Sequence, residues 1–433
     1  MATHHRSTSE NYIKGYSGTD YRVSRDSVAY AYSEKPRKKA EHEADNSAHP
    51  KPKAKKKYYY DTSLLCAVIF VFALGCLIIY SSSQYTAALE RNGNSAYYFK
   101  RQLVIGGIGL VCAVIMSLMN YRWLDKFHAI AVKISYWGSI GLLGITLVKG
   151  IASHGKARWI NIFGIQFQPA EVAKIGLIIW IAWFISKKGR SIRERDNLLN
   201  IIGHAALPFV LIIKQNISSA IIVALIAAVM LFVALENEKI FAVLGVGALA
   251  GMAAIKCGIQ FYIQQTGFST RSTHYWMRRI LGWASPETFP DDAYQTLQSL
   301  YAIGSGGITG HGLGDSIQKF GKLPEAQNDM IFSIVCEEFG FIGAATLMLL
   351  FMYLIYRIYQ VARNANDMLG TMLCTGVMAH LGIQVVLNIA VVTGVIPNTG
   401  VTLPFISYGG SAVLFTMCEI GLVLSVAHKI PRR

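Results

Sequence analysis

Residues 61–81 read DTSLLCAVIFVFALGCLIIYS, a stretch in which no charged side chain follows Asp61. A helix needs about 20 consecutive apolar residues to cross the hydrocarbon core of a bilayer. The stretch also begins too far into the chain for the apolar part of a cleavable signal peptide. We therefore expect these residues to form a first, uncleaved membrane span.

Similar apolar runs fill most of the chain beyond this stretch. Of the 433 residues, 53% are hydrophobic and only 15% are charged, with a mean hydropathy of +0.37. Soluble domains carry nearer a quarter of charged residues, so a soluble enzyme is excluded, as are disordered, collagen-like and disulfide-scaffold proteins. The seven cysteines form no CxxC pair and are expected in the core rather than in disulfides or metal sites. We predict an all-α polytopic membrane protein, a bundle of about ten transmembrane helices at 61–81, 101–119, 130–150, 169–186, 199–214, 217–235, 240–260, 329–358, 368–394 and 405–428.

Basic residues in the loops indicate the orientation of these spans. If the N-terminus is cytoplasmic, the short inner segments hold 14 Lys or Arg and the short outer loops hold seven. Cytoplasmic loops carry the excess of basic residues, so we expect both termini in the cytoplasm. The long connection 261–328, which contains the Gly-rich run 304–314, then lies outside. Long loops are usually functional, so any chemistry should face the exterior.

Residues 1–60 form a separate, basic segment ahead of the 61–433 membrane domain. They hold 13 Lys or Arg and 7 Asp or Glu, and end in KPKAKKKYYY at 51–60. We expect a disordered cytoplasmic tail whose basic end lies against anionic lipid, with its tyrosines at the interface. Topology thus explains the net charge of +16, and no nucleic-acid partner is expected.

A first cluster of ionisable residues, GKARWI at 155–160, lies just outside the fourth span. Ionisable groups in or beside a span are costly and are often functional. Lys156 and Arg158 flank Trp159, and two cations beside an indole can bind phosphate and stack on a sugar or lipid. An ordinary interfacial anchor is the alternative.

A second cluster, QPAEVAK at 168–174, opens the fourth span. Pro169 suits the first turn of a helix, where its missing N–H costs nothing. Glu171 and Lys174 are three residues apart, so they share one helix face and can neutralise each other. They are either a buried structural pair or part of a cavity that opens outward.

A third cluster, LPEAQNDMIF at 323–332, places Asp329 where the long loop meets the eighth span. A partly desolvated carboxylate has a raised pKa and is suited to proton abstraction. A helix N-cap is the alternative. No GxxxxGK[ST], HExxH or GxSxG motif occurs, so a substrate whose bond is broken must carry its own activation.

These clusters and three longer stretches carry a resemblance to a known family. The stretches are AIGSGGITGHGLG at 302–314, LPEAQNDMIFSIVCEEFGFIGA at 323–344 and NIAVVTGVIPNTGVTLPFISYGGSAVL at 388–414. Residues 61–428 resemble the SEDS family (shape, elongation, division and sporulation), the FtsW/RodA/SpoVE proteins of bacterial cell-wall synthesis. The chain departs from the family pattern at 327–330, where HTDF reads QNDM, and at 215–219, where Asn216 replaces the usual Asp.

The resemblance implies a ten-span fold with its large loop between spans seven and eight. It implies a peptidoglycan glycosyltransferase that polymerises lipid II at the outer face of the bacterial cytoplasmic membrane. A class B penicillin-binding protein and other division or elongation proteins are the implied partners, and the basic tail favours the division, FtsW-like branch. A lipid II flippase and a non-catalytic scaffold of the division machinery remain alternatives, and neither needs a base at Asp329.

The resemblance also implies roles for individual residues. Asp329 would deprotonate the 4-hydroxyl of the acceptor sugar, whose oxygen displaces undecaprenyl diphosphate with inversion. No organic cofactor is expected; a divalent cation, Mg²⁺ or Mn²⁺, could share the charge of the diphosphate through phosphate oxygens, without an assigned protein ligand. Substrate binding is assigned to Lys156, Arg158 and Lys174 on the diphosphate, Trp159 on lipid or sugar, Glu171 beside Lys174, Glu325 and Gln327 beside the acceptor, and Ser305 in the long loop.

Overall fold

The computed structural model describes residues 13–14, 20–21, 61–126, 129–153, 156–162, 165–235, 238–267 and 275–430. The chain divides into two units, Met1–Lys56 and Lys57–Arg433. In the first unit, β1 (Ile13–Lys14) and β2 (Asp20–Tyr21) pair antiparallel. The rest of the tail predicted as disordered lies outside the described residues.

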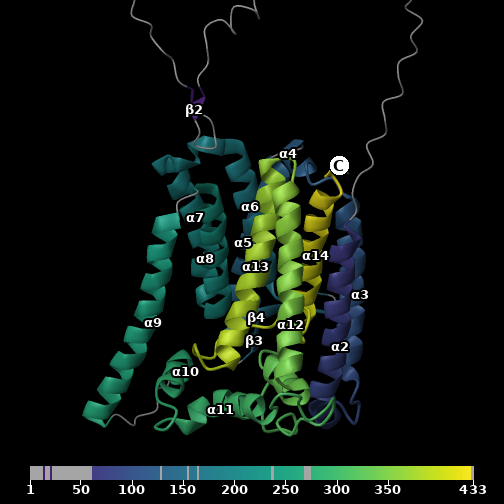
Figure 1. Ribbon diagram of the computed structural model, residues 1–433, viewed down its shortest axis with the longest axis vertical. Coiled ribbons are helices and arrows are strands. Elements are labelled where there is room, and N and C mark those ends of the chain that lie inside the picture. The colour runs from purple at the N-terminus through teal and green to yellow at the C-terminus, as the bar shows by residue number, and fades with distance from the viewer. Residues whose placement is uncertain are drawn as a thin grey trace, which may run out of the picture. The chain divides into compact units, whose positions relative to one another are not determined.

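The second unit is a bundle of long helices (Figure 1). Ten helices in the described part of the chain are long and apolar enough to cross a membrane. They confirm the predicted helical class, and each overlaps one of the predicted runs. They are α2 (Thr62–Glu90), α3 (Tyr97–Leu118), α5 (Ala129–Lys149), α6 (Pro169–Lys188), α7 (Arg195–Ile213), α8 (Ile217–Leu235), α9 (Glu238–Thr266), α12 (Ile331–Asn364), α13 (Met368–Val392) and α14 (Gly410–Ala427). Two short elements, α4 (Trp123–Lys126) and η1 (Gly189–Arg193), lie in the connections.

Local sequence signals fix where several of these helices begin. The carboxylate of Asp61 accepts a hydrogen bond from the Leu64 amide at 3.0 Å, which caps α2. Asp367 caps α13 in the same way through Gly370, at 2.8 Å. Pro169 occupies the first turn of α6, as its missing N–H predicts.

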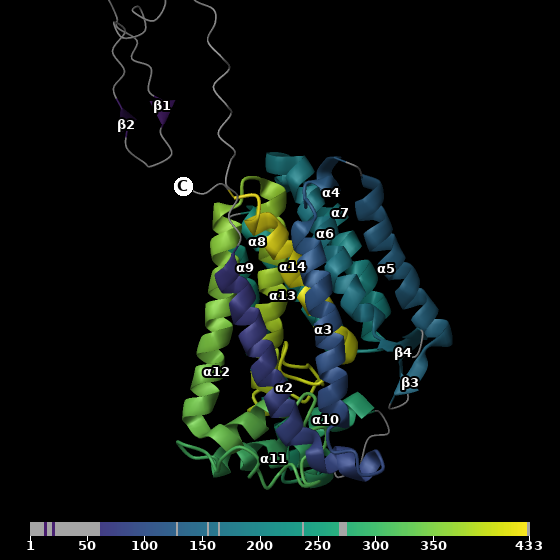
Figure 2. The same ribbon diagram turned by 90° about the vertical axis from the view of Figure 1, so that its right-hand side faces the viewer.

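Polar contacts define one end of the bundle. Arg357 near the end of α12 binds Asp61 at 2.7 Å, and the Tyr121 hydroxyl after α3 donates to Asp367 at 2.8 Å. The opposite end holds α10 (Tyr275–Ala284) and α11 (Pro290–Ser305), two helices of the predicted 261–328 loop (Figure 2). This second end is called the loop end below.

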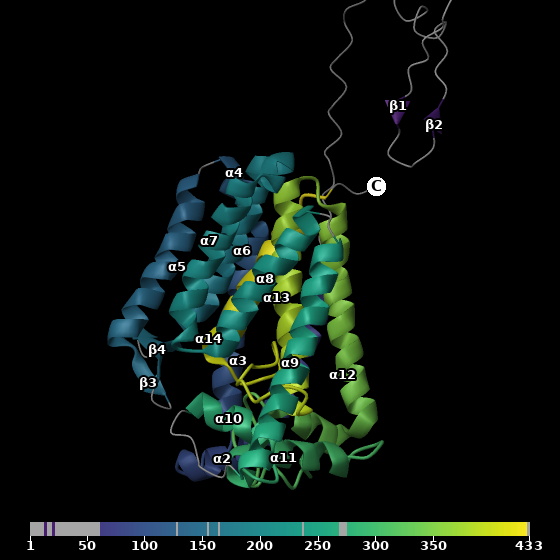
Figure 3. The same ribbon diagram turned by 90° about the vertical axis from the view of Figure 1, so that its left-hand side faces the viewer.

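A small antiparallel sheet interrupts the otherwise helical fold near the loop end (Figure 3). Its strands β3 (Ile151–Ser153), β4 (Lys156–Ile162) and β5 (Ile165–Phe167) follow in sequence order. The sequence predicts no strand here. The sheet forms because aromatic and β-branched side chains suit a pleated surface, and Phe167 packs its ring edge-on against Phe415 of α14. Trp159 and Arg158 are thereby held on a strand that leads into α6.

The helix α12 is broken at Gly340. The sequence predicts a continuous span over 329–358 and does not predict this break. Gly340 has φ 62° and ψ −163°, a conformation that side chains rarely adopt. A Cβ atom there would lie 2.4 Å from the amide nitrogen of Gly310. The break separates a short helical segment, 331–339, from the long membrane-crossing part.

The centre of the bundle is formed by α6 and α14. About three quarters of each of their spans is buried, 78% and 72%, against 6% for α9. The α9 helix therefore lies at the periphery, as Figure 1 also shows.

Candidate active site

A cavity of about 500 Å³ lies at the loop end, between parts of the chain that are far apart in sequence. Loop helices α10 and α11, strand β4, the turn before α12 and the connection between α13 and α14 all contribute to its wall. The lining residues are Arg158, Trp159, Gln168, Asn216, Arg278, Arg279, Asp291, Asp292, Tyr294, Gln295, Pro324, Glu325, Asn328, Asp329, Gly400, Thr402, Tyr408, Gly409 and Ala412.

Asp329 lies in the turn before α12 and is only 7% exposed. Burial raises the pKa of its carboxyl group from 3.8 to about 7. Nearby Arg279 lowers that pKa and Glu325 raises it. Its Oδ1 atom is buried and has no hydrogen-bond partner within the described residues.

The structure tests one of the two predictions for Asp329, the helix N-cap. The N-cap residue of α12 is Met330, and no side chain caps that helix. The N-cap alternative is therefore wrong. Instead, the amide of Asn388 in α13 donates to the backbone oxygens of Asp329 and Val401, both at 2.7 Å, and so holds the turn in place.

The connection after α13 closes the cavity on the side of Asp329. Gly400 has φ 74°, and a Cβ atom there would lie 3.7 Å from Oδ2 of Asp329. A side chain at position 400 would thus touch the carboxylate at ordinary contact distance, and the positive φ would strain its backbone. Asn398 of the same connection donates to Gln295 of α11 at 2.6 Å, which joins the connection to the long loop.

Three arginines reach the cavity from different elements. Arg158 lies on β4 and donates through Nε to the Gln215 carbonyl at 2.8 Å. Arg279 of α10 donates to the Asn398 carbonyl at 3.0 Å, and Arg278 binds Asp292 at 2.5 Å.

Sequence reasoning missed Arg278, Arg279 and Asp292. A signal was present, because the two arginines are adjacent in a loop that also contains Trp276 and Trp283.

Glu171 and Lys174 lie away from the cavity lining, buried in α6. The predicted ion pair is confirmed, with 2.8 Å between Oε2 of Glu171 and Nζ of Lys174. Nζ also lies 2.9 Å from Nε2 of His380, whose Nδ1 is 2.8 Å from Glu419. His380 and Glu419 were not predicted, because a sequence gives no sign that single polar residues of α13 and α14 meet.

The remaining predicted site residues fall into four groups. Glu325 and Trp159 line the cavity. Gln327 is buried beside it, and its backbone oxygen accepts from the Tyr408 amide at 2.9 Å. Ser305 ends α11 on the surface, away from the lining, and donates to Ala302. The side chain of Lys156 lies outside the described part of the structure.

The cavity therefore combines two chemical functions. A buried carboxylate with a pKa near 7 can accept a proton at neutral pH. Guanidinium groups held by backbone carbonyls can offset developing negative charge, and in a partly buried site such fixed charges act more strongly than in water. This arrangement suits the attack of a hydroxyl on a group that carries an anionic leaving group.

Comparison with known proteins gives consistent matches over the membrane domain. A family model for FtsW, RodA and SpoVE, described as cell cycle proteins, matches residues 61–431. Stage V sporulation protein E of Bacillus subtilis is 33% identical over 378 residues, which cover 86% of this chain and 98% of that protein. The probable peptidoglycan glycosyltransferase FtsW of Trichlorobacter lovleyi is 33% identical over 380 residues, 85% of this chain and 93% of its own.

Solved structures show the same similarity. The rod shape determining protein RodA of Thermus thermophilus superposes with a TM-score of 0.59 at 25% identity, covering 86% of this chain and 98% of that one. A chain from a study of polymerization and crosslinking by a peptidoglycan synthase complex gives a TM-score of 0.66 at 26% identity, covering 85% and 97%.

Proposed function

The chain belongs to the FtsW/RodA/SpoVE family of cell cycle proteins, and on that premise we propose that it is a peptidoglycan glycosyltransferase that polymerises lipid II. Relatives named as probable peptidoglycan glycosyltransferases cover the whole membrane domain at about a third identity. The observation that carries the proposal is Asp329, a buried carboxylate with a pKa of about 7 that faces a cavity with three arginines.

In this proposal Asp329 is the general base. Its carboxylate takes the proton from the 4-hydroxyl of the acceptor sugar while the hydroxyl oxygen attacks the anomeric carbon of the donor. The bond to undecaprenyl diphosphate breaks, and the diphosphate leaves with the electron pair from the opposite face, so the linkage inverts. General-base catalysis contributes about 10²–10⁴-fold in rate.

The negative charge that develops on the leaving diphosphate is stabilised by Arg158, Arg279 and Arg278. Arg158 and Arg279 are oriented by the carbonyls of Gln215 and Asn398, and such preorganised donors lower the barrier without reorganisation. Lys174 is buried against Glu171 and His380 and does not line the cavity, so we assign it no contact with the diphosphate. Trp159, beside Arg158 on β4, offers a ring surface to sugar or lipid.

The protein donors around the cavity do not by themselves make a metal site. Within the described residues, no three His, Cys, Asp or Glu side chains are grouped as a metal site requires. Asp292, one of the cavity carboxylates, is paired with Arg278. No step of the proposed reaction is therefore assigned to a divalent cation.

Orientation and partners complete the proposal. The excess of basic residues at the end opposite the cavity supports a cytoplasmic position for both termini and an outer position for the loop end. Lipid II then arrives with its own leaving group, so ATP is not needed. A class B penicillin-binding protein, which would crosslink the new strand, is the proposed partner, in line with the synthase complex among the structural relatives.

Polymerisation of purified lipid II by the purified full-length protein tests the proposal. We expect glycan strands from the wild type and a loss of about 10²–10⁴-fold in the Asp329→Asn variant, with unchanged expression and thermal unfolding. A flippase or scaffold would give no polymer with either protein. Near-normal polymer from the Asn variant would instead remove Asp329 from its role.

A further inference from the structure

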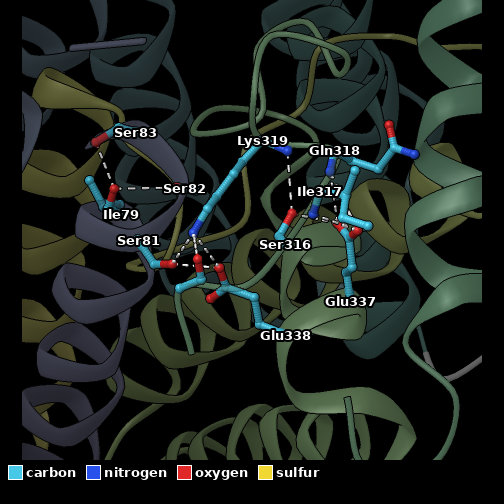
Figure 4. Close-up of polar contacts among 11 residues, drawn as sticks. Ile79, Ser81, Ser82, Ser83, Ser316, Ile317, Gln318, Lys319, Glu337 and Glu338 are labelled. Atoms are coloured by element: carbon cyan, nitrogen blue, oxygen red, sulfur yellow. Dashed lines mark hydrogen bonds and ion pairs between the residues drawn. The ribbon is translucent and has the colours of Figure 1, made fainter. Parts of the chain in front are cut away.

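A buried ion pair stands at the far end of the short helical segment 331–339, away from Asp329 (Figure 4). Lys319 of the long loop places Nζ 3.1 Å from Oε1 of Glu338, and both side chains are 0% exposed. The same Nζ donates to the hydroxyl of Ser81 in α2 at 3.2 Å and to the carbonyl of Gly314. The ion pair thus connects the loop, α12 and α2.

The neighbouring Glu337 binds the loop in a different way. Its carboxylate accepts from the Ser316 hydroxyl and from the Ile317 amide at 2.9 Å. The Gln318 amide lies 3.4 Å from both oxygens. Glu337 is 1% exposed. Two consecutive side chains of one segment are therefore held by the turn 316–319.

The Gly-rich run binds the backbone at the same point. The amides of His311 and Gly312 donate to the carbonyls of Glu337 and Glu338 at 3.0 and 2.9 Å. Beyond the break at Gly340, the next two amides donate to the carbonyls of Gly307 and Ile308. Glycine is required at 310 and 340, because a Cβ atom at either position would collide with the backbone of the other segment. The run therefore replaces the hydrogen bonds that the broken helix loses.

We propose that Lys319, Glu337 and Glu338 are positioning residues for Asp329, a proposal that rests on Asp329 being the base of the reaction. The segment 331–339 is a rod of nine residues, about 13 Å long at 1.5 Å per residue. One end carries Asp329, whose carbonyl is held by Asn388. The other end is held by the three residues, here called the clamp. Fixing both ends sets the rotation of the segment 331–339 about its axis and its position along that axis. These two together set the direction of the Asp329 carboxylate.

The clamp is poorly explained by stability alone. Burying a charged pair costs desolvation that its attraction repays only with good geometry, and apolar replacements are often as stable. Oε2 of Glu338 is buried without a hydrogen-bond partner in the described part of the chain. An ion pair of this kind adds little to the free energy of folding, but its directed hydrogen bonds are suited to fixing the orientation of the segment 331–339.

The test compares three full-length variants with the wild type in the lipid II polymerisation assay. The Lys319→Met/Glu338→Gln double variant removes both charges together, so no lone charge is left buried. The Glu337→Gln variant keeps the shape of the side chain but replaces one accepting oxygen by an amide. Lys322→Met is the matched control, because Lys322 is an exposed cation of the same loop and takes no part in the clamp.

We expect both clamp variants to lose about 10²-fold in kcat, the effect of a misplacement of about 1 Å, with the KM for lipid II within about twofold of wild type. Their kcat should also fall off at lower pH than that of the wild type, because a loosened turn admits water to Asp329 and lowers its pKa. The control should match the wild type in all three quantities.

Hydrogen–deuterium exchange gives a readout that does not depend on activity. Peptides covering 306–339 should exchange faster in the clamp variants, while those of α13 and α14 should not change. Faster exchange with unchanged kcat and pH profile would overturn the positioning role, as would unchanged exchange. Absence of polymer from the wild type would refute the proposed function instead. The exchange result would then still show whether the clamp orders residues 306–339.

Discussion

The pH dependence of polymerisation tests the role of Asp329 directly. As a general base Asp329 acts only when deprotonated, so activity should be lost as the pH falls through the pKa of about 7. Near pH 6 about one tenth of the molecules carry the ionised base, against about nine tenths near pH 8. We therefore expect kcat to rise about tenfold over this interval, measured with fluorescent lipid II at saturating concentration.

Two neighbours of Asp329 should move this profile in opposite directions. Glu325 raises the pKa of Asp329, so Glu325→Gln should shift the midpoint to lower pH and increase activity in mild acid. Arg279 lowers that pKa, so Arg279→Met should shift the midpoint to higher pH. Since Arg279 is also proposed to offset the charge of the diphosphate, the KM of the Arg279→Met variant for lipid II should rise as well, and the pH midpoints are therefore compared on kcat.

Two results would refute this reasoning. A wild-type profile that is flat between about pH 5.5 and 8.5 would mean that no group with a pKa near 7 limits the reaction. Shifts of the same sign in the two variants would mean that the charges act on another group. Thermal unfolding of each variant, measured across the same range, controls for loss of the folded protein.

Two further predictions concern the buried ion pair of α6 and the tail. Glu171→Ala and Lys174→Ala should each destabilise the protein by about 3–5 kcal/mol, because the partner is left as a lone buried charge; thermal unfolding measures this, and a double change to apolar residues should restore stability. If activity also returns in the double variant, Lys174 does not bind substrate. Deleting residues 1–56 should leave polymerisation in detergent unchanged, since the count of basic residues predicts that the tail and the site lie on opposite faces. In a Cys-free background, an impermeant thiol reagent on wall-stripped cells should label Ser305→Cys and spare Ser47→Cys; the reverse would overturn the orientation.

The fold was largely predictable because hydrophobic length is a strong signal in a membrane protein. Lipid supplies no hydrogen bonds to the backbone, so a long apolar run must become a helix. The helix break at Gly340 was not predictable in the same way. It depends on hydrogen bonds to a run about 30 residues earlier, and neither stretch alone shows that they meet.

The candidate site was predictable only in part. Asp329, Arg158 and Trp159 stood out because polar groups beside an apolar span are unusual, and all three line the cavity. Lys174 stood out for the same reason, yet it lies in the core with His380 and Glu419. The same pattern therefore marks both a residue of the candidate site and a buried network, and only the cavity lining separates the two. Arg279 was missed because its effect on the pKa of Asp329 depends on the fold, which brings together two residues that are 50 positions apart in the sequence.

The size of the cavity bears on how the enzyme could be inhibited. About 500 Å³ is the volume of a site for one drug-sized molecule, whereas the proposed reaction joins two lipid-linked saccharides. Only the reacting ends can be enclosed together, and the growing strand must leave as it forms. A compact compound with an anionic group for Arg158 and Arg279 and a hydrogen-bond donor for Asp329 would match the charged lining of the cavity. Because the proposed orientation places the cavity on the outer face, such a compound would act without crossing the cytoplasmic membrane.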